Sequence, residues 1–257
     1  MSGVKSLKAS ADAIYIYDGS FPGFLCCVFE SVYSRQMPVD IVPHEKAPLT
    51  LLDTKHIATD MQKARRVRDS ISKKISMGAL DLVSTVFLSC LEQKELKMLA
   101  FLLKGYGQGG RLLNSLGDPV LSPLLKARKH LMGEAHLLTG FVRFSDIGGV
   151  LVSTITPKNY ILPFIKKHFT TRFREENFII FDKTNRAALF YQNGKSKIVE
   201  ADSFEPGDIS PEEANYQSLW KRFYDTIAIE GRENPRCRMT HMPKRYWENM
   251  LEVRDLL

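Results

Sequence analysis

The chain has 257 residues, of which 44% are hydrophobic and 25% are charged, and its formal net charge is +7. These values are ordinary for a folded soluble protein with a sizeable core. Its apolar runs are too short to span a bilayer, and the stretch from Met1 to Asp12 lacks the apolar core of a signal peptide. We therefore expect a soluble protein in the cytoplasm.

The first predicted elements are a strand, a tight turn and a helix. Ala13–Tyr17 is a short β-prone run. Ser20 is suited to cap a helix, and Pro22 is tolerated in a first helical turn. The apolar stretch Phe24–Tyr33 continues that helix, and a further short extended piece is expected at Leu49–Leu52.

From about Asp60 to Leu131 the periodicity is helical, with apolar residues every three or four positions. We expect a glycine cluster beginning at Gly105 to end one of these helices. The first apolar stripe consists of Ala64, Val67, Ile71 and Ile75, and later helices are predicted at Ala79–Cys90, at Gln93–Lys104 and from Pro123 onward.

After Thr139 the pattern changes to short strands around one helix. This order predicts a local antiparallel sheet with a covering helix, followed by a helical tail from Pro211. The strands are expected at Phe141–Phe144, Val150–Ile155, Phe178–Phe181, Ala187–Tyr191 and Ile198–Val199, and the helix at Asn159–Arg174.

The predicted fold class is therefore α+β: a mainly antiparallel sheet with a covering helix, a basic helical subdomain and a helical C-terminal tail. We expect a single compact unit over residues 1–257. Its successive parts are a strand–turn–helix start at 13–55, a basic helical region at 56–131, the sheet with its helix at 132–205 and the tail at 206–257.

The excess positive charge is concentrated in one stretch. Met61 to Leu131 holds 13 basic and 5 acidic residues, whereas the rest of the chain holds 23 basic and 24 acidic residues. Such a stretch suits a polyanionic partner through phosphate neutralisation, and a solvated helical surface is the alternative. The candidate nucleic-acid ligands here are Arg65, Arg66, Arg68, Lys73 and Lys74.

The glycine cluster from Gly105 to Gly110 has two interpretations. Backbone amides in such a cluster can approach a phosphate, with Arg111 beside them as a nucleic-acid ligand. The cluster follows a predicted helix and lacks the residues of a phosphate-binding loop, which favours a plain helix stop.

Glu134 and His136 form a candidate acid–base pair. On an extended segment, alternate side chains face together, and a carboxylate then raises the pKa of an imidazole; on a helix the two diverge. A structural hydrogen bond is the alternative. Arg143, between two phenylalanines, is a candidate phosphate ligand or an ion-pair partner.

The segment from Arg232 to Trp247 alternates basic residues with aromatic, sulfur and proline positions. Cations could hold phosphates while aromatic faces stack on bases. The alternative is a tail pinned to the body, with Tyr246, Trp247 and Met250 buried. The candidate nucleic-acid ligands here are Arg236, Arg238, Lys244, Arg245, Tyr246 and Trp247.

The four cysteines include no C-x-x-C pair, which argues against a zinc ribbon or a thioredoxin-like site. Cys26 and Cys27 lie in an apolar helical stretch and are expected to be buried thiols. No metal site is predicted, and the sequence leaves any cofactor open.

Three motifs together resemble a bacterial family of unknown function that is named for DNA metabolism. They are the run from Tyr17 to Leu25, the run from Glu134 to Phe144, and the run from Met242 to Trp247. The resemblance implies a gene neighbour encoding a radical SAM protein of DNA modification or repair. Some members of the family that the chain resembles are also fused to a domain similar to uracil-DNA glycosylase.

Three hypotheses follow. The leading one is a DNA-associated accessory protein that acts with the radical SAM protein. The second is an enzyme acting on a nucleobase or nucleotide, with Glu134 and His136 as acid–base groups and Arg143 as a phosphate clamp. The third is a protein–protein adaptor without DNA affinity. The sequence does not establish a reaction.

Overall fold

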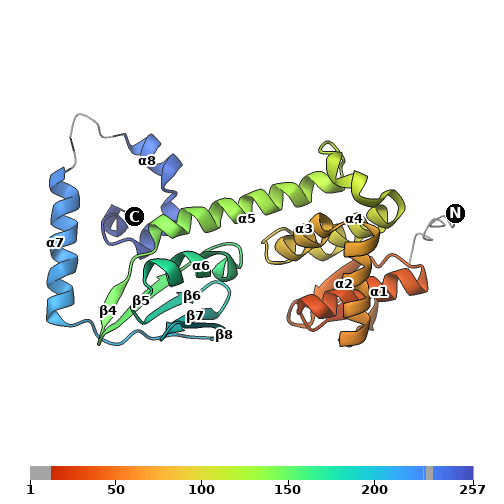
Figure 1. The fold of residues 1–257 in the computed structure, drawn as a ribbon, viewed down its shortest axis with the longest axis horizontal. Coiled ribbons are helices and arrows are strands. Elements are labelled where there is room, and N and C mark those ends of the chain that lie inside the picture. The colour runs from red at the N-terminus through yellow and green to blue at the C-terminus, as the bar shows by residue number, and fades with distance from the viewer. Residues whose placement is uncertain (1–12, 228, 230–233, 257) are drawn as a thin grey trace. The chain divides into compact units, whose positions relative to one another are not determined.

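The computed structural model of the protein describes residues 13–227, 229 and 234–256. The expectation for the first twelve residues lies outside that part. The chain divides into two compact units, Met1–His130 and Leu131–Leu257, where the sequence predicts one. Each unit has its own sheet (Figure 1). Helices and strands are mixed in both, so the α+β class is confirmed.

The first unit contains a three-stranded parallel sheet in the order β2-β1-β3. The strand predicted at the start of the chain is confirmed as β1, whereas the extended piece expected at Leu49–Leu52 lies just downstream, in β3. The strand β2 was not expected from the sequence, because it is short and pairs only through a non-local parallel ladder. The strands are β1 (Ala13–Tyr17), β2 (Asp40–Pro43) and β3 (Asp53–His56), and a short 3₁₀ turn, η1 (His44–Lys46), follows β2.

Helix α1 (Phe21–Ser34) connects β1 to β2 and begins as predicted. The Ser20 hydroxyl accepts a hydrogen bond from the backbone N–H of Gly23 at 3.0 Å, and Pro22 occupies the first turn. Cys26 and Cys27 are buried free thiols, as expected.

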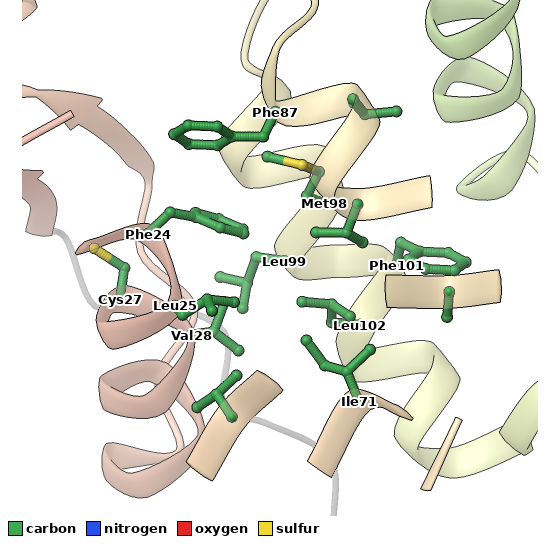
Figure 2. Close-up of a cluster of buried hydrophobic side chains, with 14 of the residues drawn as sticks. Phe24, Leu25, Cys27, Val28, Ile71, Phe87, Met98, Leu99, Phe101 and Leu102 are labelled. Carbon is green, nitrogen blue, oxygen red and sulfur yellow. The ribbon is translucent and has the colours of Figure 1, made fainter. Parts of the chain in front are cut away.

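Four further α-helices follow, and the predicted apolar stripe of the first, from Ala64 to Ile75, is buried. Their packing forms the core of the first unit (Figure 2). Phe24 and Val28 of α1 lie there beside Ile71 and the α4 residues Leu99 and Leu102. The helices are α2 (Met61–Lys74), α3 (Met77–Phe87), α4 (Lys94–Gln108) and α5 (Leu121–Phe141), and η2 (Gly109–Asn114) is a 3₁₀ segment between the last two.

The prediction that the glycine cluster ends a helix at Gly105 is wrong in position. Helix α4 continues through Gly105 to Gln108, and Gly109, which has a φ of +65°, is its C-cap. A Cβ at Gly105 would lie 2.8 Å from Cδ1 of Ile75. The glycine therefore allows α4 to approach α2 closely, which tertiary packing decides and a helix-propensity argument misses.

The second unit contains a five-stranded sheet in the order β4-β5-β6-β7-β8. Its pairs are antiparallel except β5 with β6, which are parallel and joined through α6. The mainly antiparallel sheet with a covering helix is thus confirmed. The elements are β4 (Ser145–Ile147), β5 (Val150–Ile155), α6 (Leu162–Arg172), β6 (Phe178–Asp182), β7 (Ala187–Gln192) and β8 (Lys195–Glu200).

The strand predicted at Phe141–Phe144 is wrong, because α5 extends to Phe141. Its period-two pattern is too short to compete with a helix that already carries buried residues at Leu131, Ala135 and Leu138.

The C-terminal part is helical, as predicted, and its last turns are pinned to the second unit. Tyr246, Trp247, Met250 and Val253 are buried. This confirms the alternative of a tail packed against the body. The elements are α7 (Pro211–Ile227), α8 (Pro235–His241) and the 3₁₀ segments η4 (Lys244–Asn249) and η5 (Arg254–Leu256).

Candidate nucleic-acid interface

Helix α2 presents its cations on the surface that its buried stripe leaves free. The Asp60 carboxylate caps the helix by accepting hydrogen bonds from the N–H groups of Gln62 at 2.8 Å and Lys63 at 3.2 Å. Residues advance by about 100° around an α-helix, so a buried stripe turns its neighbours outward. Five predicted cations are exposed in this way: Arg65, Arg66, Arg68, Lys73 and Lys74.

Four of these cations line one open depression of about 720 Å³. Its other lining residues are polar or flexible, and Asp69 is the acidic one. The depression is lined by Met61, Gln62, Arg65, Arg66, Asp69, Ser70, Lys73 and Lys74, and we call these residues the α2 face.

The cations of the α2 face are not neutralised by ion pairs. Within the described part of the chain, no carboxylate lies within 4.0 Å of the charged groups of these four side chains. The guanidinium of Arg66 lies 5.9 Å from the ring centre of Phe29, which orients it without cancelling its charge. These charges remain available to an anionic ligand.

Arg68 lies at a second depression of about 640 Å³, between α1, α2 and α3. Its walls include Phe21, Leu25, Met77 and Leu80, with Arg65 shared between the two depressions. The structure therefore places all five α2 cations on one helix, distributed over two adjoining surfaces.

Arg111 lies near the C-terminal end of α2. A Cβ at Gly110 would lie 3.1 Å from the carbonyl oxygen of Ile75, and one at Gly109 would lie 3.9 Å from that of Lys74. This close packing brings the chain around Arg111, which is exposed, beside the end of the α2 face.

Arg143, predicted as a phosphate ligand or an ion-pair partner, is an ion-pair partner. Its Nε lies 3.1 Å and its Nη2 2.5 Å from Oε1 of Glu252, whose side chain is buried. Nη1 donates to the carbonyl oxygen of Gly140 at 2.8 Å. The guanidinium thus fixes the end of α5 against the C-terminal segment.

The predicted stacking platform of the tail is not exposed. Tyr246 donates a hydrogen bond to Oε1 of Glu134 at 3.0 Å, and the Trp247 Nε1–H donates to the carbonyl oxygen of Met242 at 2.8 Å. Both rings are buried, so neither face can receive a base.

The cations of the tail differ in their contacts and in their exposure to solvent. Lys244 lies 5.5 Å from the ring centre of Trp247, and Arg245 lies 4.6 Å from that of Tyr246. Arg236 is exposed on α8, whereas Arg238 is half-buried.

Glu134 and His136 do not face one another. They lie two residues apart on α5, where Glu134 is 2% exposed and His136 is on the surface. The Glu134 carboxylate accepts hydrogen bonds from the N–H groups of Lys158 at 3.1 Å and Asn159 at 2.8 Å. With Arg143 held by Glu252, the three groups of the enzyme hypothesis do not converge on one pocket.

Glu134 is instead the centre of a buried polar network. Burial favours the neutral acid, but the N–H donors of Lys158 and Asn159 outweigh it, and the pKa of Glu134 lies below its ordinary value. Nη2 of Arg245 lies 3.3 Å from Oε1, and the Asn159 side chain donates to Oε2 at 2.6 Å. The ionised carboxylate links α5 to the loop before α6 and to the tail.

Asp182 is a buried carboxylate that sequence reasoning missed. It accepts hydrogen bonds from the N–H groups of Thr184 at 3.1 Å and Asn185 at 3.0 Å in the turn between β6 and β7. Burial is the main cause that raises its pKa to about 6. The signal in the sequence was the Asp182–Asn185 spacing, which is typical of a turn closed by an aspartate side chain.

The raised pKa of Asp182 gives a pH prediction. Because the pKa of Asp182 is higher in the folded chain than in the unfolded chain, the protonated carboxyl stabilises the folded state. This contribution is complete below the ordinary pKa of an aspartate and is lost as the pH rises toward about 6. We therefore expect Asp182 to lower the free energy of unfolding of the second unit as the pH rises from about 4 to about 6. Tryptophan fluorescence measures it selectively, because both tryptophans, Trp220 and Trp247, lie in that unit. Asp182→Asn should show a smaller fall, and an equal fall in both proteins would contradict the assignment.

Residues 92–252, more than half of the chain, match a family described as a domain of unknown function, DUF4130. The chain belongs to this family. The match includes α4, α5 and the described second unit through Glu252, and α2 lies outside it. The resemblance seen in the sequence, to a family of unknown function, is thus confirmed at that level.

No protein of curated function matches the chain. Among solved structures, it is similar to a pGpG-specific phosphodiesterase, PggH, from Vibrio cholerae, at 12% identity and a TM-score of 0.33. The similarity covers 69% of this chain and 81% of that protein. Likeness at this TM-score is too slight to support an argument about fold or function.

Two further properties bear on the kind of site. Among the described residues, no group of three His, Cys, Asp or Glu side chains is placed to hold a metal ion. In the same part of the chain, no helix combines the length and apolar character that a membrane crossing needs.

Proposed function

We propose that this DUF4130 protein binds nucleic acid through the α2 face. The observation that carries the proposal is the set of four exposed cations around one depression, none of them paired with a carboxylate of the described chain. A polyanion gains affinity there because each phosphate contact releases counterions. The resemblance noted in the sequence supports DNA as the polyanion.

The spacing of the cations suits a phosphate backbone. Arg66 and Lys73 are two helical turns apart, about 10 Å along the axis. Phosphates follow one another at intervals of several ångströms along a strand, so one α2 face can contact more than one of them. Gln62 and Ser70 add neutral hydrogen-bonding groups to the same surface.

The α2 face makes a direct prediction for DNA binding. We expect wild-type protein to bind fluorescein-labelled duplex DNA in a polarisation assay, with affinity falling steeply as salt rises. The quadruple change of Arg65, Arg66, Lys73 and Lys74 to Gln should weaken binding by about tenfold and reduce the slope of log K against log[salt] by up to about 3.6.

A matched control removes the same charge elsewhere. Changing Lys166, Lys167, Lys195 and Lys197 to Gln alters α6 and β8 of the second unit and leaves the α2 face intact. Its affinity and salt slope should stay close to those of wild type. The proposal fails if wild type does not bind at low salt, or if both quadruple variants lose affinity equally.

The proposal extends to a protein partner that the sequence resemblance implies. We propose that the chain acts with a radical SAM protein of DNA modification or repair. Co-purification of the two, with and without nuclease treatment, distinguishes the cases. A complex that survives nuclease indicates direct contact, one that is lost indicates contact through DNA, and absence of a complex in both arms refutes the partnership.

A further inference from the structure

Helix α7 presents an apolar stripe to solvent. None of its described residues is buried, although it has 17 residues and several large apolar side chains. Five of these side chains recur at helical spacing and are from 43% to 69% exposed. The stripe, which we call the α7 stripe, consists of Tyr216, Leu219, Trp220, Phe223 and Ile227. Monomeric proteins rarely leave such a continuous surface uncovered.

The contacts of α7 with its own unit are polar and lie to one side of the stripe. Gln217 donates to the hydroxyl of Ser145 at 3.0 Å, and Lys221 pairs with Asp255. Trp220 borders this side, with its Nε1 at 3.4 Å from Oε2 of Glu252. These contacts hold the helix without covering its apolar surface.

We propose that the α7 stripe binds the α7 stripe of a second copy of this chain, in an antiparallel pair around a two-fold axis. The spacing of its central residues is the same in both chain directions: three, one and three positions from Tyr216 to Phe223. An axis between Leu219 and Trp220 therefore sets each of them opposite the other in the second copy. It also sets Tyr216 opposite Phe223, as a self-complementary interface requires.

The size of the stripe suits such a pair. Five large side chains of this exposure cover roughly 500 Å² on each copy and about 1,000 Å² in the pair, near the lower limit of a specific interface. A groove of about 550 Å³ beside the helix extends this surface, with Phe144 and Leu251 among its walls next to Tyr216 and Trp220.

The charges of α7 favour the antiparallel direction. Glu212 and Glu213 lie in its first turn, whereas its second half contains Arg222 and Asp225 together with Lys221, which is paired with Asp255. In the antiparallel pair Glu213 of one helix lies opposite Thr226 of the other, one helical turn from Arg222, and the two helix dipoles oppose each other. A parallel pair would place like charges together.

The first test is the mass of the protein in solution, by sedimentation velocity across a range of concentrations. Wild type should sediment as a dimer, and Leu219→Glu/Phe223→Glu should weaken association by about tenfold or more, because charges in an apolar interface oppose burial. Leu116→Glu is the control, since Leu116 is a 70% exposed leucine of the other unit. A monomeric wild type, or a double variant that dimerises like wild type, would overturn the proposal.

The second test locates the axis and does not depend on the charged variants. In a Cys90→Ser/Cys237→Ser background, Leu219→Cys should form a disulfide-linked dimer under mild oxidation, because this position lies beside the axis. Ser218→Cys is the control, since Ser218 is exposed on the opposite side of α7. Equal cross-linking at both positions would contradict the antiparallel pair. DNA binding by the α2 face is unaffected by either outcome.

Discussion

Replacement of Glu134 by leucine is expected to lower the free energy of unfolding of the second unit by about 3–5 kcal/mol. The change removes the acceptor for the N–H groups of Lys158 and Asn159 and for the hydroxyl of Tyr246. Buried donors that lose their partner retain their desolvation cost. It also removes the carboxylate that pairs with Arg245.

The measurement is urea unfolding followed by tryptophan fluorescence. Both tryptophans belong to the second unit, so the transition reports on that unit without a contribution from the first. His136→Ala is the control on the same helix, and its exposed side chain should change the free energy by no more than about 0.5 kcal/mol. Similar midpoints for the two variants would show that the Glu134 network does not stabilise this unit.

The second large effect is expected at Tyr17 in the first unit. Its hydroxyl donates a hydrogen bond to Oε1 of Glu95 at 2.9 Å, and both side chains are buried. Burial, and then the charge of Glu95, raise the pKa of Tyr17, so the phenol stays protonated and remains a donor. Tyr17→Phe should therefore lower the free energy of unfolding by about 2–3 kcal/mol, because the buried Glu95 carboxylate loses the hydrogen bond from this hydroxyl.

Amide hydrogen exchange is the suitable measurement, because the first unit contains no tryptophan. Amides of β1 and α4 should exchange faster in Tyr17→Phe than in wild type. Tyr33→Phe is the matched control, since Tyr33 is 79% exposed on α1. Equal exchange in the two variants would contradict a structural role for the Tyr17–Glu95 hydrogen bond.

Local signals predicted much of the secondary structure. Ser20 and Pro22 marked the start of α1, and the spacing from Ala64 to Ile75 marked the buried side of α2. These signals act within one or two helical turns, so the sequence contains them directly. Long-range pairing was harder to predict, and the parallel strand β2 was missed for that reason.

Four cations of the α2 face, Arg65, Arg66, Lys73 and Lys74, were named from the sequence, because exposed cations around an apolar stripe follow from helix geometry alone. The polar members of the face were not predicted, and Arg68 lies at the second depression. The tail was different. Tyr246 and Trp247 have the composition of a base-stacking surface, yet both are buried. Aromatic rings serve cores and nucleic-acid surfaces equally well, so their neighbours in space determine which role they have.

The sequence by itself determined the α+β class, the positions of most helices and the concentration of positive charge between Met61 and Leu131. These properties depend on composition and on periodicity along the chain. The tertiary structure alone decided that Glu134 meets Tyr246 and Arg245, and that Arg143 meets Glu252. Those partners are more than a hundred residues apart, and only the folded chain brings them within hydrogen-bonding distance.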